Sequence, residues 1–331
     1  MGKLFEGRVA IITGSGQGIG KELALYMASE GCKIVTNNRK KGSSMQAHDG
    51  KTVKLSPEDE AVIRPLVGDA ETTAAAIIAA GGEAVPVYGS SSNAEDCKRM
   101  VDAAIEKWGR IDIVINNAAS HWNGNIKDAD IEKWHLSIDS KLNGTFYLLH
   151  YALPYMLKQK YGKFVNFSSN AFVGLAGMAS YSSAACGLWA FTKSAAQDLA
   201  ADGIAVNCVT PLAATRSWYN TVAEFRAEGI PIDVITQQAP AGMQMTPDNM
   251  VPAIAYLAAE ECEVTGQMVK VEADGSLALY ADAAEYNNCG KDCAKDGPWT
   301  VDELREVFST KLMKGAQEAE TKLVVSKSEY D

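Results

Sequence analysis

The first stretch of this sequence with a possible binding or catalytic role contains four glycines, one at every second position. They lie in TGSGQGIG, residues 13–20, between a β-branched apolar run and a helix-period pattern. Glycine permits a tight turn and lets an anion approach backbone N–H groups at a helix N-terminus. In this strand–turn–helix setting the pattern predicts a site for the pyrophosphate of a dinucleotide. The expected contact residues are Gly14, Ser15, Gly16, Gly18, Ile19 and Gly20.

The residues that follow the second predicted strand indicate which dinucleotide would bind. An acidic residue there would accept a hydrogen bond from the ribose 2′-OH, but the chain has NNRKK, with neutral Asn38 followed by Arg39, Lys40 and Lys41. A guanidinium fork suits a 2′-phosphate. We therefore expect Asn38 and Arg39 to bind NADP(H) in preference to NAD(H), with NAD(H) as the alternative.

Strand-like and helix-like segments alternate along the chain and would position these residues. Apolar β-branched runs such as RVAIIT and IDIVINN alternate with amphipathic stretches such as AEDCKRMVDAAIEKW. This order predicts an α/β fold with a doubly wound, parallel, seven-stranded sheet covered by helices on both faces. We expect one dinucleotide-binding and catalytic domain over residues 1–275, with a long loop insertion at 38–69. A tail would follow over 276–331, with a helix that begins near residue 300 at the T-x-x-E capping box of Thr300 and Glu303.

Composition excludes several classes of partner. The 331 residues carry a formal net charge of −10, so the chain lacks the basic surface that nucleic acid or an anionic membrane would require. No apolar run reaches membrane-spanning length, and the N-terminus runs into a strand without a signal-peptide pattern. Seven scattered cysteines favour reduced thiols and a cytoplasmic protein. Cys289 and Cys293 form the only close pair and lack matching ligands, so we expect no metal site.

Five segments together resemble the short-chain dehydrogenase/reductase family over about residues 5–275. They are TGSGQGIG, NNA at 116–118, NFSS at 166–169, Tyr181, and VNCVTP running on to Thr215. A weaker resemblance is to the branch that contains the (3R)-hydroxyacyl-CoA dehydrogenases. The family resemblance implies a Rossmann-like fold and hydride transfer between a nicotinamide and a carbonyl or alcohol. It also implies cofactor contacts at Ser90, Asn117, Ala118 and Thr215, although Ser90, Ala119 and Leu212 depart from the residues usual in the family.

The resemblance also implies which residues act on the substrate, and two of them have changed. Tyr181 matches the tyrosine that exchanges a proton with the substrate oxygen, and Ser169 matches the serine that holds this oxygen, with Ser168 as the alternative. The position of the family's lysine is Ala185, and that of its relay asparagine is Lys141. Because an ammonium lowers the pKa of a nearby phenol, we hypothesise that Lys141 supplies the cation lost at position 185. The alternative is that Lys141 extends to solvent from an unused pocket.

Further residues are candidates for the substrate side of this site. His121 follows a predicted strand at the sheet edge where open parallel sheets place their sites, so its imidazole could serve as acid, base or substrate contact. Trp122, Trp218 and Tyr219 are expected near the substrate mouth. Residues 212–245 resemble the family's substrate lid, and their apolar and small side chains favour a largely apolar substrate.

The sequence leaves three functions open. The first is an NADP(H)-dependent oxidoreductase acting on a ketone or secondary alcohol with the altered relay. The second is a non-catalytic subunit of the same fold that assembles with an active relative, and the third is a redox-neutral isomerase or lyase. Family members commonly associate through two long helices, expected here around residues 130–158 and 180–202, so we expect a homo-oligomeric dimer or tetramer, or a hetero-oligomer with an active relative.

Overall fold

The structure is a computed structural model that falls into two units. It describes residues 3–42, 64–219, 246–273, 275–280 and 300–307, with isolated positions 57, 60, 61, 295 and 310. The first unit covers Met1–Leu279 and Ser326–Asp331, and the second covers Tyr280–Val325. Most of the loop predicted at 38–69, most of the lid at 212–245, and Cys289 and Cys293 lie outside the described residues.

The described residues of the first unit form at their centre a sheet of eight strands, in the order β3-β2-β1-β4-β5-β6-β7-β8. Each neighbouring pair is parallel up to β7, and β8 pairs with β7 antiparallel. Every residue of β1, β4 and β5 is buried, which fits the apolar sequence of β1, whereas β4 and β5 also bury the polar residues Asn116, Lys163 and Asn166. The strands are β1 Val9–Ile12, β2 Lys33–Asn38, β3 Ala84–Tyr88, β4 Ile113–Asn116, β5 Gly162–Phe167, β6 Ile204–Leu212, β7 Met268–Glu272 and β8 Leu277–Leu279.

The doubly wound parallel architecture is confirmed, but the expected count of seven strands is wrong by one. The additional strand, β8, contains only Leu277–Leu279, and all three of its residues are exposed. It folds back on β7 through a tight turn in which Gly275 has φ of 89° and donates its N–H to the carbonyl of Glu272. A three-residue edge strand without a buried face carries no apolar alternation, so the pattern used for the other strands could not identify it.

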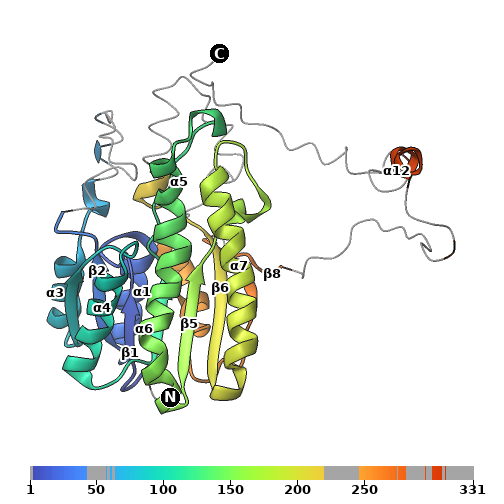
Figure 1. Cartoon of the computed structure of the whole chain (residues 1–331). Helices are drawn as coiled ribbons and strands as arrows, with labels where there is room; N and C mark the ends of the chain where they lie inside the picture. The colour runs from blue at the N-terminus through green and yellow to red at the C-terminus, as the bar shows by residue number, and fades with distance from the viewer. Residues whose placement is uncertain are drawn as a thin grey trace. The chain divides into compact units, whose positions relative to one another are not determined.

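Helices cover both faces of the sheet (Figure 1). One core contains buried side chains of α1, α3 and α10, and the other contains those of α4, α6 and α7. In Figure 1, α6 and α7 run along the side of the sheet turned toward the viewer. The main helices are α1 Gly18–Ser29, α3 Ala70–Ala79, α4 Ala94–Trp108, α5 Ile131–Ser137, α6 Gly144–Gln159, α7 Ala179–Leu199 and α10 Val251–Tyr256.

The long helix expected around residues 130–158 contains a π-helical turn. Helix α5 continues into this turn at Ile138–Asn143, and α6 begins at Gly144. The Thr145 hydroxyl donates to the carbonyl of Lys141 at 2.8 Å, and the Ser140 hydroxyl donates to that of Leu136 at 2.6 Å. Such π turns interrupt α-helices most often at functional sites, and this one contains Lys141.

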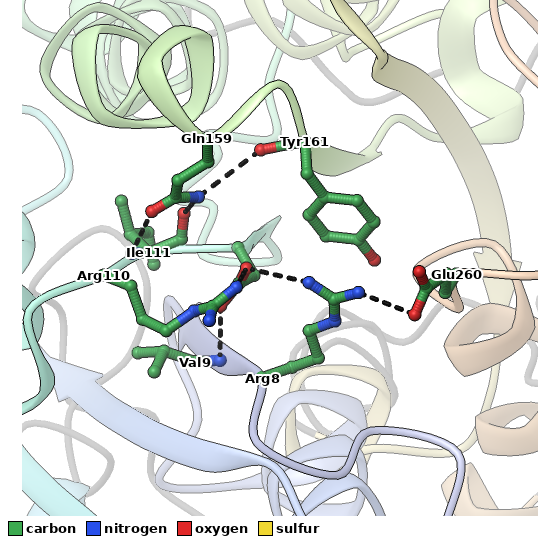
Figure 2. A network of polar contacts seen from close by, with 8 residues as sticks. Arg8, Val9, Arg110, Ile111, Gln159, Tyr161 and Glu260 are labelled. Carbon is green, nitrogen blue, oxygen red and sulfur yellow. Dashed lines mark hydrogen bonds and ion pairs between the residues drawn. The ribbon is translucent and has the colours of Figure 1, made fainter.

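A polar network fixes the amino ends of the central strands (Figure 2). The fully buried carboxylate of Asp112 accepts hydrogen bonds from the guanidinium of Arg8 at 3.3 Å, from that of Arg110 at 2.6 Å, and from the N–H of Val9 at 3.0 Å. Arg8 also stacks 3.9 Å from the ring centroid of Tyr161. The network joins β1 to the segments before β4 and β5, at the edge of the sheet opposite the glycine-rich turn.

Within residues 300–307, the described part of the second unit, the chain forms helix α12 Val301–Val307. The Thr300 N–H donates to the Glu303 carboxylate at 2.7 Å, and the Glu303 N–H donates to the Thr300 hydroxyl at 3.3 Å. These reciprocal bonds satisfy N–H groups at the start of the helix. Among the described residues, no helix is both long enough and apolar enough to cross a membrane.

Candidate active site

Hydrogen bonds from the Asn117 side chain fix the conformation of the glycine-rich turn. The Asn117 side-chain amide donates to the carbonyls of Thr13 at 2.8 Å and Gly14 at 3.3 Å. The Thr13 hydroxyl in turn accepts from the N–H groups of Asn117 and Ala118, both at 3.0 Å. A Cβ on Gly14 or Gly20 would lie 2.9 or 2.5 Å from the Asn117 amide nitrogen, so the close approach requires glycine at both positions. Asn117 and Ala118 therefore support the turn directly.

The other predicted cofactor residues surround this turn. Ser15 is fully buried and accepts a hydrogen bond from the Asn37 N–H at 2.9 Å, which ties the turn to β2. Thr215, beyond the end of β6, lies against Gly18, where an added Cβ would be 3.3 Å from the threonine methyl group. Ile19 packs on the core beneath α1. Ser90 follows β3, and its N–H donates to the Asp96 carboxylate at 2.7 Å.

The adenosine side of the turn contains Asn38 and a carboxylate that the sequence reasoning missed, Asp69. A Cβ on Gly16 would lie 2.1 Å from Asn38 Oδ1 and 2.5 Å from the Asp69 Cα, so Gly16, Asn38 and Asp69 meet at this point. Asp69 begins α3 and accepts hydrogen bonds from the Thr72 N–H at 3.0 Å and the Tyr88 hydroxyl at 3.1 Å. Burial raises the pKa of Asp69, but these hydrogen bonds and one from the Gly42 N–H outweigh it and leave the pKa below its usual value.

Positive charge near the turn comes from two arginines. Arg39 is exposed just after β2, whereas Lys41 forms an ion pair with Glu71 at 2.5 Å. Arg216, which the sequence reasoning also missed, is buried and donates from Nε to the side-chain oxygen of Gln17 at 2.8 Å. Burial first, and then the charge of Arg39, lower the pKa of Arg216 to about 10.

Tyr181, Lys141 and His121 come together from three separate segments. Tyr181 lies in the first turn of α7, and the Lys141 Nζ is 5.0 Å from the centroid of its ring. The His121 ring centroid lies 5.4 Å from that of Tyr181, at an interplanar angle of 57°. The Ser120 N–H, next to His121, donates to the Ser140 hydroxyl at 2.9 Å, so the π turn also fixes the segment after β4.

Lys141 points into the protein. The residue is 3% exposed, and its Nζ donates to the carbonyl of Phe167 and, at 3.1 Å, to that of Ser168. The alternative, in which Lys141 extends to solvent, is therefore wrong. Ala185, one helical turn beyond Tyr181, is also fully buried, so the two exchanged positions of the family pattern face the interior of the same site.

The two candidate serines differ in their surroundings. The Ser168 hydroxyl is buried and donates to the carbonyl of Ala185 at 2.9 Å. Ser169 is half-buried, begins the 3₁₀ turn Asn170–Val173, and accepts from the Ala171 N–H at 3.2 Å. Ser168 is thus committed to the protein interior, and Ser169 is the more exposed of the two serines.

The aromatic candidates follow His121 and Thr215 in the sequence. Trp122, immediately after His121, is buried, and the Lys133 ammonium lies 5.1 Å from its ring centroid. Trp218 and Tyr219 are half-buried in the helical segment after Thr215. Tyr181, His121 and Lys141 bring together a phenol, an imidazole and an ammonium, which are groups that can donate a proton to a carbonyl oxygen and stabilise the resulting phenolate.

Comparison with known proteins places this geometry among enzymes. A family model described as enoyl-(acyl carrier protein) reductase matches residues 54–274. A 3-oxoacyl-[acyl-carrier-protein] reductase from Synechocystis sp. is 30% identical over 82% of this chain and 98% of its own length. Peroxisomal multifunctional enzyme type 2 from Drosophila melanogaster is 30% identical over 93% of this chain, which spans only 46% of that longer protein. The crystal structure of a short chain dehydrogenase from Mycobacterium avium superposes with a TM-score of 0.71 at 26% identity, covering 94% of this chain and 96% of the other.

Proposed function

The chain belongs to the short-chain dehydrogenase/reductase family, and we propose that it is an NADP(H)-dependent oxidoreductase that reduces a ketone or oxidises a secondary alcohol. The observation that carries this proposal is the convergence of Tyr181, Lys141 and His121 at the edge of the sheet that also holds the glycine-rich turn. In this family the bound nicotinamide supplies or accepts the hydride. The residues of the chain then have to bind the cofactor, orient the substrate and move one proton.

The backbone of the glycine-rich turn and the N–H donors beside it both suit a bound dinucleotide. Side chains at Gly14, Gly16 and Gly20 would collide with protein atoms, which keeps the surface of the turn bare. The N-terminus of α1 then presents its N–H groups and the positive end of the helix dipole to a pyrophosphate. Asn38 Oδ1 is buried without a hydrogen-bond partner among the described residues, and it is an acceptor that a ribose hydroxyl would satisfy.

Charges of both signs influence which cofactor binds. Arg39 is exposed beside the end of β2 and supports a contact with the 2′-phosphate of NADP(H). The Asp69 carboxylate lies at the same end of the turn and would repel that phosphate. The Asp69 carboxylate already accepts hydrogen bonds from the Thr72 N–H and the Tyr88 hydroxyl, which offset part of its negative charge. We therefore propose NADP(H) as the preferred cofactor, with NAD(H) as the competitor against which it has to be measured.

Tyr181 and Ser169 would act on the substrate oxygen. In reduction, the Ser169 hydroxyl donates a hydrogen bond to the carbonyl oxygen, which orients the carbonyl carbon for hydride transfer. The Tyr181 phenol gives its proton to the same oxygen as the alcohol forms, and in oxidation the phenolate takes that proton back. His121, whose ring contacts that of Tyr181, is placed to return the proton to the phenolate from solvent.

Lys141 would supply the positive charge that this proton transfer requires. A free phenol has a pKa of about 10 and is a poor base near neutral pH. An ammonium beside the ring favours the negatively charged phenolate electrostatically. The two backbone carbonyls that bind the Lys141 Nζ keep the charge beside Tyr181. This arrangement supports a relocated cation, from position 185 to position 141.

The relatives suggest which carbonyl to test first. One is named a 3-oxoacyl-[acyl-carrier-protein] reductase, and by that name it reduces a ketone in an acyl chain held as a thioester. Trp122, Trp218 and Tyr219, if they line the substrate side of the site, would suit an apolar chain of this kind. We therefore propose a 3-oxoacyl thioester, or the corresponding 3-hydroxyacyl thioester, as the substrate class.

The subunits would associate through α6 and α7. Phe146, Tyr155 and Leu157 on α6 are exposed apolar side chains in this single chain. Apolar side chains along a helix that already covers one face of the sheet are typical of a subunit interface. We propose a dimer or tetramer in which these helices face those of another subunit, in a cytoplasmic protein with a small-molecule substrate.

A non-catalytic subunit remains the second candidate, since Ala185 replaces the lysine expected from the family. The test is oxidation of NADPH, followed by absorbance, with a 3-oxoacyl thioester and purified protein. We expect turnover by the wild type and none above background by Tyr181→Phe. Binding of NADPH without turnover of any ketone or alcohol would instead support the non-catalytic subunit or a redox-neutral reaction.

A further inference from the structure

Buried serines next to Tyr181, Lys141 and His121 connect the three segments that carry these residues. Ser140 lies in the π turn immediately before Lys141 and is 6% exposed. Its hydroxyl accepts a hydrogen bond from the N–H of Ser120, the residue before His121, at 2.9 Å. The segment after β4 and the π turn are therefore joined one residue away from both of these side chains.

The position of Ser140 is itself fixed by two further hydrogen bonds. Its hydroxyl donates to the carbonyl of Leu136 at 2.6 Å, one turn earlier in α5. Its own carbonyl accepts a hydrogen bond at 3.2 Å from the hydroxyl of Ser91, a buried residue between β3 and α4. A Cβ on Gly144 would lie 2.5 Å from the Ser91 carbonyl oxygen, so the start of α6 also packs against this segment. The Ser140 hydroxyl is therefore held in one orientation and offers a fixed acceptor to the Ser120 N–H.

A second hydroxyl contact joins the same helical segment to α7. The hydroxyl of Ser180, the residue before Tyr181, donates to that of Ser137 at 3.2 Å, and both serines are buried. Ser137 ends α5, three residues before Ser140. The end of α5 and the π turn thus form a common support for the residues that precede Tyr181 and His121.

From these contacts we infer that Ser140 is a positioning residue, which sets the orientation of the His121 ring against Tyr181. The inference rests on the proposed function for its effect on turnover, whereas the contact between the two rings is present without a substrate. A serine hydroxyl can accept from Ser120 while it donates to Leu136. An alanine at position 140 would remove the acceptor of the Ser120 N–H, so the segment that carries His121 would lose this contact with the π turn.

The orientation of His121 can be followed directly by NMR in the whole protein, labelled with ¹³C-histidine. The chain contains four histidines, and the His121 resonance is the one that His121→Gln removes. Tyr181→Leu removes the neighbouring ring current and shows where this resonance lies without the ring contact. Ser140→Ala should move the His121 resonance toward that position and leave the resonance of His150, which is exposed on α6, unchanged.

The reaction should slow without a change in cofactor binding. Ser140→Ala should lower kcat, for a ketone that the wild type reduces, by roughly 10- to 100-fold, since a displacement of about 1 Å in an active site has an effect of this size. The Kd for NADPH should remain unchanged. In a His121→Gln background the same substitution should have no further effect, because Ser140 acts through His121.

Thr265→Val is the matched control. The Thr265 hydroxyl also accepts a hydrogen bond from a backbone N–H of another segment, that of Val206 at 3.1 Å, but near the amino end of β6. Its removal should leave both the His121 resonance and kcat unchanged. If Ser140→Ala does not fold, Ser140→Cys, whose sulfur is only a weak acceptor, should show smaller changes in the same direction.

Three results would overturn the inference. They are an unmoved His121 resonance in folded Ser140→Ala, an unchanged kcat in that variant, and an equal loss of kcat from Ser140→Ala in the wild-type and His121→Gln backgrounds. A wild type that reduces no ketone and oxidises no alcohol would instead contradict the proposed function. The shift of the His121 resonance would still show in that case whether Ser140 positions the ring.

Discussion

Lys141 lies in the π-helical turn that separates α5 from α6, and its ammonium is 5.0 Å from the ring centroid of Tyr181. The family pattern has a lysine one helical turn after this tyrosine, and here that position is the fully buried Ala185. We propose that Lys141, on the adjoining helical segment, supplies the cation that position 185 lacks.

Removal of this cation should slow the reaction more than it disturbs cofactor binding. Lys141→Met should lower turnover at neutral pH by about 10- to 1,000-fold, because the phenolate of Tyr181 would then form without a neighbouring positive charge. The matched control is Lys193→Met on α7, where the ammonium lies 5.9 Å from the Trp189 ring and away from the site. Equal rates for Lys141→Met and the wild type would show that Lys141 is only structural.

Asp69 should contribute stability that depends on pH in the acid range. Asp69→Ala removes the cap of α3 and should lower the free energy of unfolding by about 1 kcal/mol at pH 7. The pKa of Asp69 in the folded protein lies below its value of about 3.9 in an unfolded chain. Its contribution is therefore fully present above the unfolded value and is lost as the pH falls through the folded one.

Urea unfolding between pH 7 and pH 3 measures this difference. The control is Asn93→Ala, which removes an uncharged cap from α4 and should cost a similar amount without this pH dependence. A difference between wild type and Asp69→Ala that stays constant down to pH 3 would contradict the assignment.

The network of Figure 2 should be among the most sensitive parts of the fold. Asp112→Ala leaves the guanidinium groups of Arg8 and Arg110 without their buried partner, and should lower the free energy of unfolding by about 3–5 kcal/mol. Glu260→Gln removes only the exposed partner of Arg8 and should cost less than about 1 kcal/mol. Chemical denaturation of both variants tests the ranking, and an equal cost would contradict it.

Gly16 should tolerate no side chain, for a reason independent of its backbone angles. In Gly16→Ala the new methyl group would lie 2.1 Å from Asn38 Oδ1 and 2.5 Å from the Asp69 Cα, so backbone has to move. We expect a loss of about 1–3 kcal/mol in stability together with weaker cofactor binding. Gly187→Ala in α7 is the control, because its nearest neighbour is the flexible end of Leu142 at 3.1 Å. Unfolding midpoints and NADPH titration should separate the two variants.

Much of the fold could be predicted because the apolar pattern that identifies each strand or helix lies within one short segment of sequence. The buried strands of the parallel sheet are short apolar runs, and the helices between them carry apolar positions at helical spacing. The eighth strand, Leu277–Leu279, was missed because it is short and exposed, so its pairing with β7 is decided by a turn rather than by burial. The π turn at Ile138–Asn143 was also missed, since its residues continue the helical pattern on both sides.

Residues of the site could be predicted only at positions where the sequence can be compared with the family's pattern. The loss of lysine at 185 and its gain at 141 suggested that Lys141 faces Tyr181, and the structure places the two together. Asp69 and Arg216 could not be found in this way, because each is a single charged residue in a segment without periodicity. Their relation to the glycine-rich turn depends on contacts between residues 53 and 199 positions apart in the chain, Gly16 with Asp69 and Gln17 with Arg216.

The most direct test of the account restores the family's arrangement of charge. The double variant Lys141→Asn/Ala185→Lys should regain most of the wild-type turnover, measured as NADPH oxidation with a ketone that the wild type reduces. The single variant Lys141→Asn should lose about 10- to 1,000-fold, because only its cation is missing. If the double variant is as slow as Lys141→Asn while both remain folded and bind NADPH, a cation at either position is not what activates Tyr181, and the relocation of the lysine is contradicted.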